Sequence, residues 1–192
     1  AYVDPLNPPD FTGHNYFISL TEYDLTSKAL FGEVYWKATD TLRVTAGLRY
    51  TNDKKRTRGS GATLLAPGRG PVFDAVRHVR FEEVTGRLNV DWSPDLSFTD
   101  STLVYASYSK GYKGGGFNPP GVVALGLNPD FQPEFVNAYE IGTKNTLLDG
   151  SLVLNLTGFY YDYKGYQIAR SVNRSIYNEN IDATIKGVEL ES

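Results

Sequence analysis

Hydrophobic and polar residues alternate with a period of two along most of this chain. In the segment TLRVTAGLRYT, one side of an extended backbone carries Leu42, Val44, Ala46, Leu48 and Tyr50, and the other carries arginine, threonine and glycine. Each such strand has one apolar and one polar face. The pattern predicts strands at residues 27–39, 42–55, 79–93, 101–113, 136–147 and 151–167, and a seventh strand near the C-terminal end.

The seventh segment changes phase along its length. Its apolar residues keep one phase up to Ile185 and take the other phase at Val188 and Leu190. A β-bulge inserts one residue and shifts the alternation, and glycine is common at such sites. We therefore expect a bulge near Gly187.

Short and long connections alternate between these segments. The short ones lie at residues 40–41, 93–100 and 148–150, the last with an Asp-Gly hairpin signal, and the long ones lie at 56–78, 114–135 and 169–179. We expect residues 1–24 to form a further loop or a preceding segment. The sequence thus predicts an all-β fold, an antiparallel up-and-down meander of about seven long strands, with its short turns at one edge.

The glycine cluster Gly114 to Gly116 beside Lys113 raises the question of a phosphate-binding loop. Such a loop needs its glycines directly before a helix, whose free N–H groups hold the anion. Here the residues that follow include Pro119 and Pro120, which cannot begin a helix in this context. We interpret the cluster as a strand running out into a long loop.

Composition narrows the class of protein. The 192 residues carry a net charge of −3, and no basic stripe is present for nucleic acid. Without cysteine there is neither a disulfide framework nor a thiolate metal site. No group of residues suggests catalysis, a metal site or a cofactor. Because the chain starts at Ala1 and ends in mid-pattern, we expect it to be a fragment of a larger protein.

Strand length separates the two environments that could cover the apolar faces. Strands in soluble sheets average about 5–6 residues, whereas membrane-spanning strands need about 9–11. The predicted segments are all of the longer kind, and aromatic residues lie near their ends, as in the aromatic girdles of membrane barrels. The interface aromatics predicted in this way are Trp36, Tyr50, Trp92, Tyr112 and Tyr160.

Charged residues on the polar faces fit the same picture. A cation facing lipid costs about 2–4 kcal/mol at the membrane midplane, so a face that carries many charges must be wet. We therefore expect the charged residues to face the interior of a transmembrane β-barrel. They are Arg43, Arg49, Glu83, Arg87, Glu140 and Lys144.

Several stretches resemble the barrel hairpins of the TonB-dependent outer-membrane receptors. The most specific are YSKGYKGGGF, YEIGTK and GVELE, which occur in this order, and the resemblance extends over about residues 25–192. It implies part of a barrel of about 22 strands with an N-terminal plug domain, located in the bacterial outer membrane. The chain itself shows neither a plug nor a TonB box.

The resemblance also implies a function and partners. Receptors of this family import scarce ligands, most often ferric siderophores, with energy from the TonB complex. The expected partners are outer-membrane lipid, the plug of the same parent chain, the TonB complex and a small-molecule ligand such as a ferric siderophore. Residues near the long loops are candidates for ligand contact: Lys113, Phe117, Tyr166 and Arg170.

Two other functions share parts of this evidence. A passive porin-type barrel would have the same alternation and the same girdles but no plug. A soluble β-domain that binds carbohydrate could use the tyrosine-rich loops as stacking platforms, with a second sheet covering its apolar face.

Overall fold

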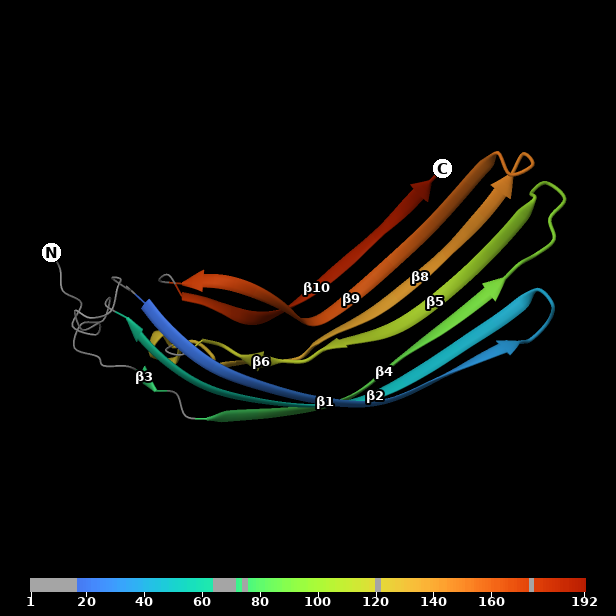
Figure 1. Ribbon diagram of the computed structural model, residues 1–192. Helices are drawn as coiled ribbons and strands as arrows, with labels where there is room; N and C mark the ends of the chain where they lie inside the picture. Colours follow the sequence, from blue (N-terminus) through green and yellow to red (C-terminus); the bar gives the residue numbers. More distant parts are fainter. Residues whose placement is uncertain (1–16, 64–71, 74–75, 120–121, 173–174) are drawn as a thin grey trace.

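The computed structural model describes residues 17–63, 72–73, 76–119, 122–172 and 175–192. Seven long strands form one antiparallel sheet, each paired with the next long strand along the chain. They are β1 (Phe17–Lys37), β2 (Leu42–Thr63), β4 (Arg77–Trp92), β5 (Ser101–Lys113), β8 (Glu134–Leu147), β9 (Leu152–Val172) and β10 (Ser175–Glu191). The predicted meander is confirmed, and Figure 1 shows it as a single curved layer.

Shorter elements lie at the loop end of the sheet. The two-residue strand β3 (Val72–Phe73) pairs with β2, and β6 (Gly116–Phe117) pairs with β7 (Asp130–Phe131) in a separate small sheet. The 3-10 helix η1 (Val122–Leu125) lies between β6 and β7. Within the described residues, no helix is long and apolar enough to cross a membrane.

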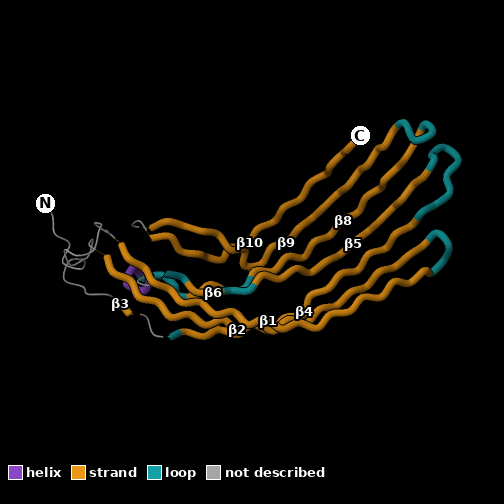
Figure 2. Tube along the Cα trace, in the orientation of Figure 1, coloured by secondary structure: helices purple, strands orange, loops and turns teal. Residues whose placement is uncertain are grey.

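The three short turns gather at the opposite end, as Figure 2 shows. The turn between β8 and β9 places Leu148, Asp149 and Gly150 at φ 57°, 53° and 82°. Asp and Gly tolerate this left-handed conformation better than most residues, which explains the Asp-Gly signal in the sequence. The predicted short connections are confirmed.

The strand register gives the sheet one apolar and one polar face. Val44 lies opposite Trp36 on one side and opposite Val90 on the other, and Leu42 lies opposite Trp92. Among the described residues, the only buried hydrophobic side chain is Val122, and Leu48 is 69% exposed. No second layer covers the apolar face of the described sheet, contrary to the soluble sandwich.

The apolar band has the height of a membrane's hydrocarbon layer. On β2 it runs from Leu42 to Tyr50 and is followed by Asn52 and Lys54 on the same face. At about 3.3 Å per residue and a tilt of about 40°, this stretch spans roughly 20 Å along the membrane normal, close to the apolar band of about 25 Å in outer-membrane barrels.

Several predicted boundaries were wrong because the strands continue beyond this band. β1 begins at Phe17, so the division at residue 24 falls inside a strand, and residues 1–16 lie outside the described part. β2 extends to Thr63, and β9 and β10 continue through most of the predicted loop at 169–179. Above the membrane both faces of a strand are wet, so backbone pairing persists while the alternation disappears.

The predicted bulge lies elsewhere. Gly187 pairs in register with Phe159, and the irregularity falls between Ile181 and Ala183. There, Lys164 and Gly165 of β9 together oppose Asp182, and Gly165 has a φ of 64°, which favours glycine. Ile185 and Val188 therefore lie on opposite faces of a regular strand.

Candidate functional site

The connection between β5 and β8 folds against the polar face of the sheet. β4 and β5 are paired only as far as Gly86 and Lys110, whereas β4 stays paired with β2 up to Arg77. The described residues of the connection occupy the region where the strands part, and at the left of Figure 1 they lie between the loop ends of β1–β2–β4 and the β9–β10 hairpin. We call the described residues of this connection, 114–119 and 122–133, the inner loop.

Lys55 of β2 holds the start of the inner loop. Its Nζ donates to the carbonyl oxygens of Gly114 and Gly115, at 3.3 Å for Gly114, and lies 5.8 Å from the ring centre of Phe81. Burial lowers the pKa of the Lys55 amine, and the carboxylate of Asp53 acts in the opposite direction. A Cβ on Gly115 would come within 2.3 Å of the carbonyl oxygen of Phe131, so this tight approach requires glycine.

Arg77 of β4 contacts both ends of the inner loop. Its guanidinium donates to the carbonyl oxygen of Pro129 at 2.7 Å and to Oδ1 of Asp130 at 3.0 Å. The same group lies 4.8 Å from the ring centre of Phe117, a cation–π contact. One face of the Phe117 ring is thus in contact with an arginine.

Asn118 joins the inner loop to β10. Its side chain is buried, with 4% of the residue exposed, and its amide exchanges two hydrogen bonds with the backbone of Asn178, at 2.7 and 3.0 Å. The same amide nitrogen donates to the carbonyl oxygen of Asn128 at 2.8 Å. The Asn118 amide therefore replaces a strand partner for β10 at this point.

A second amide cluster attaches the end of the inner loop to β9 and β10. The Asn180 side chain accepts from the backbone N–H of Gln132 at 2.7 Å and donates to the Gln132 carbonyl oxygen at 2.9 Å. Gln167 donates to the carbonyl oxygens of Gln132 and Gly114, at 3.1 and 3.3 Å. The inner loop is thus held mainly by polar side chains from β2, β4, β9 and β10.

The four residues predicted to touch ligand occupy separate places. Lys113 faces Glu134 at 3.5 Å, and Nε of Arg170 lies 3.2 Å from Glu179. Tyr166 packs edge-on against Tyr163 with ring centres 5.3 Å apart. No hydrogen bond, ion pair or ring contact links any two of the four in the described residues, so their ligand role stays a prediction.

Sequence reasoning missed the residues that build the inner loop. Asn118, Gln132 and Asn180 are uncharged and lie in segments without alternation, so no periodic signal marks them. Gln167 is the last residue of a predicted strand, and its position does not specify its partner. The available clue was the abundance of Asn and Gln beside Pro and Gly, which indicates backbone groups satisfied by side chains. His78, predicted to lie in a loop, belongs to β4.

Four of the predicted interface aromatics lie on the apolar face. Trp36 and Trp92 are near the short turns, and Tyr50 and Tyr160 are toward the other end; all four are substantially exposed. Tyr160 continues a row of tyrosines across β5, β8 and β9, in which Tyr139 lies 5.0 Å from Tyr108 and 6.3 Å from Tyr160. Their position at the membrane interface remains a prediction.

Tyr112 differs from the other four aromatics. Its hydroxyl donates to Oδ2 of Asp53 at 3.2 Å, and Asp53 shares a face with Thr51 and Lys55 of β2. Tyr112 thereby links β5 to β2 across the gap that the inner loop fills. This structural role beside the inner loop competes with its predicted role as an interface anchor.

Most charges on the polar face have partners within the sheet. Arg43 pairs with Asp91 at 2.9 Å, and Arg87 pairs with Glu33 at 2.6 Å. Lys144 lies 5.9 Å from the ring centre of Tyr105, and Glu140 accepts from the Tyr161 hydroxyl. In the described part of the chain, no group of three or more acidic or histidine side chains could hold a metal ion.

Comparison with known proteins identifies the family to which this sheet belongs. A family model described as "TonB dependent receptor-like, beta-barrel" matches residues 2–192. The pesticin receptors of Yersinia pestis and Yersinia enterocolitica are each 27% identical over 178 residues, which is 92% of this chain and 25% of theirs. The chain thus spans about a quarter of the length of these relatives.

Two solved structures share the fold. The ferric yersiniabactin uptake receptor FyuA from Yersinia pestis matches with a TM-score of 0.70 and 24% identity, over 91% of this chain and 25% of that one. The ferric-catecholate import receptor Fiu from E. coli K12 matches with a TM-score of 0.62 and 18% identity, over 88% of this chain and 25% of that one.

Proposed function

Because this chain belongs to the β-barrel family of TonB-dependent receptors, which are outer-membrane proteins of Gram-negative bacteria, we propose that it supplies seven strands of an active importer of a ferric siderophore. The family is one of receptors rather than enzymes. The proposal rests on one observation about the sheet. Its polar face carries the inner loop, and its other face carries an apolar band about as tall as the hydrocarbon layer of a membrane.

The relatives support the choice of ligand class. Two similar structures are described as a ferric yersiniabactin uptake receptor and a ferric-catecholate import receptor, and the sequence relatives are pesticin receptors. A chelate of ferric iron is bulky and commonly anionic, so it needs a wide lumen with an entrance whose lining can be rearranged. A loop held by side-chain amides suits such an entrance.

Further strands and a plug would complete the transporter. β1 and β10 each pair on one side only within the described sheet, and exposed edges of this length invite aggregation unless other strands cover them. We propose that other strands of the same parent protein pair with the free edges of β1 and β10 and so close the barrel. A plug domain would fill the lumen, and the TonB complex would supply the energy.

The candidate ligand residues receive specific roles in this proposal. Arg170 is paired with Glu179 near the C-terminal end of β9. An anionic chelate would compete with the Glu179 carboxylate for the guanidinium. Lys113 is more exposed than its partner Glu134 and would interact in the same way. Movement of Arg77 away from the Phe117 ring would free the ring face that the guanidinium contacts. Tyr166 would offer a ring face at the rim.

Iron uptake tests the proposal against a passive porin. The complete protein would be expressed in a host that lacks its own siderophore receptors, and uptake of radiolabelled iron would be measured with ferric yersiniabactin and with a ferric catecholate. We expect uptake of at least one chelate, and its loss in the same host without TonB. Uptake that persists without TonB, or that applies equally to unrelated small solutes, would instead identify a passive pore.

A further inference from the structure

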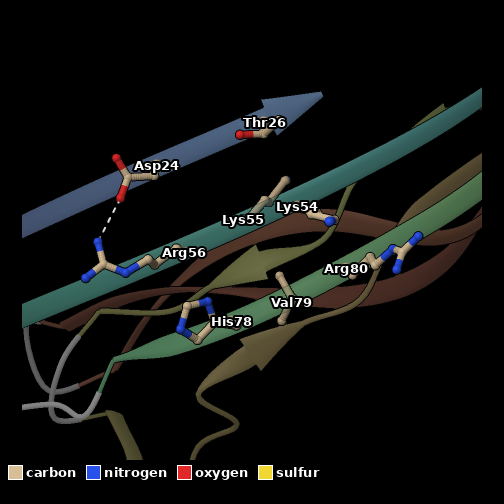
Figure 3. A pocket seen from close by; sticks show the side chains of 8 residues that line it. All are labelled: Asp24, Thr26, Lys54, Lys55, Arg56, His78, Val79 and Arg80. Carbon is tan, nitrogen blue, oxygen red and sulfur yellow. Dashed lines mark hydrogen bonds and ion pairs between the residues drawn. The ribbon is translucent and has the colours of Figure 1, made fainter. Parts of the chain in front are cut away.

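The sheet splits between β4 and β5 at the level where the apolar band ends. The last backbone pair between these strands is Gly86 with Lys110, although β4 stays paired with β2 up to Arg77. The unpaired lengths are residues 77–85 of β4 and 111–113 of β5, and we call the region between them the split. Figure 3 shows the outer part of β4 beside β2, to which it remains paired.

The backbone of β4 has no partner on the side of the split. Among the described residues, no backbone hydrogen bond joins residues 77–85 to β5 or to the inner loop. Val84 lies in the last apolar row, opposite Tyr50, so the split begins at the outer surface of the hydrocarbon layer. Unpaired backbone groups are costly inside that layer, whereas above it water or a polar ligand can bond to them.

Side chains, rather than backbone pairs, close the split. By alternation Tyr112 belongs to the outward side of β5, yet its hydroxyl donates to Oδ2 of Asp53, on the polar face of β2. The carbonyl oxygens of Gly114 and Gly115 accept hydrogen bonds from Nζ of Lys55. A Cβ on Gly114 would lie 3.0 Å from the Tyr112 hydroxyl oxygen, so the inner loop begins directly beside this ring.

A cation and aromatic rings line the outward mouth of the split. The Lys110 amine lies 5.1 Å from the ring centre of Phe135, and the ring centres of Phe135 and Tyr112 are 5.7 Å apart. Lys110 takes part in no ion pair among the described residues. The rings of Tyr108 and Tyr139 continue this aromatic surface toward the apolar band. The mouth therefore combines an uncompensated positive charge with an apolar surface.

The height and the chemistry of the mouth select one class of ligand. A molecule with an anionic head and an acyl chain rests in the outer leaflet, with the chain in the hydrocarbon and the head at this level. Each buried CH₂ group raises the membrane affinity of such a molecule about fourfold, so a long chain keeps it in the leaflet. It would reach the barrel from the side rather than from the water above.

This lateral route rests on the importer function proposed above. We propose that the split admits ferric chelates that carry an acyl chain, from the outer leaflet to the polar face of the sheet. The anionic head meets Lys110 first and then competes with the carbonyl oxygens of Gly114 and Gly115 for the amine of Lys55. Hydrogen bonds to an anion are about twice as strong as those to neutral acceptors, so the head displaces the start of the inner loop.

Uptake of two matched chelates by the complete protein tests the proposal. The probes are the ferric complex of a synthetic tris-catecholate and the same complex with a dodecanoyl chain, both made with radioactive iron. The 192 residues contain no cysteine, so Val84→Cys can be labelled with a bulky maleimide on intact cells, any cysteine elsewhere in the parent protein being replaced by serine. We expect this label to abolish uptake of the acylated chelate and to leave uptake of the plain chelate unchanged.

Leu30→Cys provides the matched control. Leu30 lies opposite Tyr50, as Val84 does, so it stands at the same height on the outward face, but on β1 and away from the split. The same label at this position should leave uptake of both chelates unchanged. Unlabelled Val84→Cys should also transport both chelates, which shows that the substitution itself does not disturb the barrel.

Photo-crosslinking locates the acylated chelate independently of transport. The gallium complex of the acylated probe, with a diazirine on the chain next to the head, would be added to the complete protein in lipid nanodiscs. We expect crosslinks in peptides that cover Val84 and residues 110–113. Each cation near an anionic head is worth about a fivefold change in affinity, so Lys110→Gln should bind the probe about fivefold more weakly.

Four results would overturn the proposal. These are the absence of crosslinks from these peptides, uptake of the acylated chelate that persists with the label at Val84, an equal loss with the label at Leu30, and an equal loss of both chelates. Failure of the importer function gives a different pattern. Neither chelate would then enter the cells of any variant, whereas the crosslinks would still mark the split.

Discussion

Replacing Asn118 with alanine is expected to release the inner loop from β10. The side-chain amide makes three hydrogen bonds, to the backbone N–H and carbonyl of Asn178 and to the carbonyl of Asn128. Because Asn118 is buried, the variant leaves these backbone groups without their partner. Each lost hydrogen bond costs about 0.5–1.5 kcal/mol, so we estimate a loss of about 2–4 kcal/mol in the free energy of docking.

Hydrogen exchange measures this loss directly. Amides of the inner loop exchange through undocking, so a loss of about 2–4 kcal/mol should speed their exchange by roughly 30- to 1000-fold, up to the rate of the unprotected chain. The assay would follow peptides covering residues 116–131 by mass spectrometry in the complete protein. Amides of β5 and β8 below the inner loop should exchange as in the unsubstituted protein.

Asn128→Ala provides the matched control. Asn128 lies in the same loop but is exposed, and within the described residues its side chain accepts one hydrogen bond, from the backbone N–H of Asp130 at 3.0 Å. This change should alter exchange by a small factor, because an exposed group exchanges its partner for water. Equal exchange in the Asn118 and Asn128 variants would show that the buried amide does not hold the loop, and the reasoning would fail.

The apolar face and the bulge yield two further predictions. Leu88→Arg, midway along the apolar band of β4, should destabilise the barrel by about 2–4 kcal/mol, measured by refolding into lipid vesicles. The control Asn89→Arg, on the polar face, should have little effect. Equal effects of the two substitutions would argue against contact of the apolar face with lipid. At the bulge, the backbone N–H of Gly165, and to a smaller extent the Lys164 amine, lower the pKa of the Asp182 carboxyl. The charged carboxyl therefore stabilises the fold at pH values above its unfolded pKa of about 3.9. This contribution is lost as the pH falls through the lower pKa of the folded state. The difference in thermal stability between the unsubstituted protein and Asp182→Asn should therefore vanish at the acid end, and a difference independent of pH would contradict this.

The sequence predicts the part of the fold in which the two faces meet different solvents. Between Leu42 and Tyr50, lipid on one side and water on the other impose strict alternation, so strand, face and turn can all be read from the residues. Above Tyr50 both faces are wet, and Asn52, Lys54 and Arg56 continue the strand without an apolar partner. The predicted strands therefore end too early at this end of the sheet.

The inner loop was harder to predict for a related reason. Its position depends on contacts between segments that are far apart in the sequence, such as Asn118 with Asn178 and Lys55 with Gly114. An amide side chain can satisfy any nearby backbone group, so its residue type does not specify its partner. The sequence marks Lys113 and Phe117 as candidates for ligand contact because they are charged and aromatic, whereas Lys55 and Arg77 are the charged residues that hold the loop.

The way the inner loop is held bears on how it can move. Val122 is the one buried hydrophobic residue in the described chain, so little apolar burial opposes undocking. The other contacts are mainly hydrogen bonds, together with the ion pair of Arg77 with Asp130 and its cation–π contact with Phe117. Water can replace an exposed hydrogen bond at a net cost of about 0.5–1.5 kcal/mol. Such a loop is well ordered while docked and is cheaper to displace than a loop with an apolar core. Under the proposed importer function, a loop that is cheap to displace suits the passage of a bulky ligand.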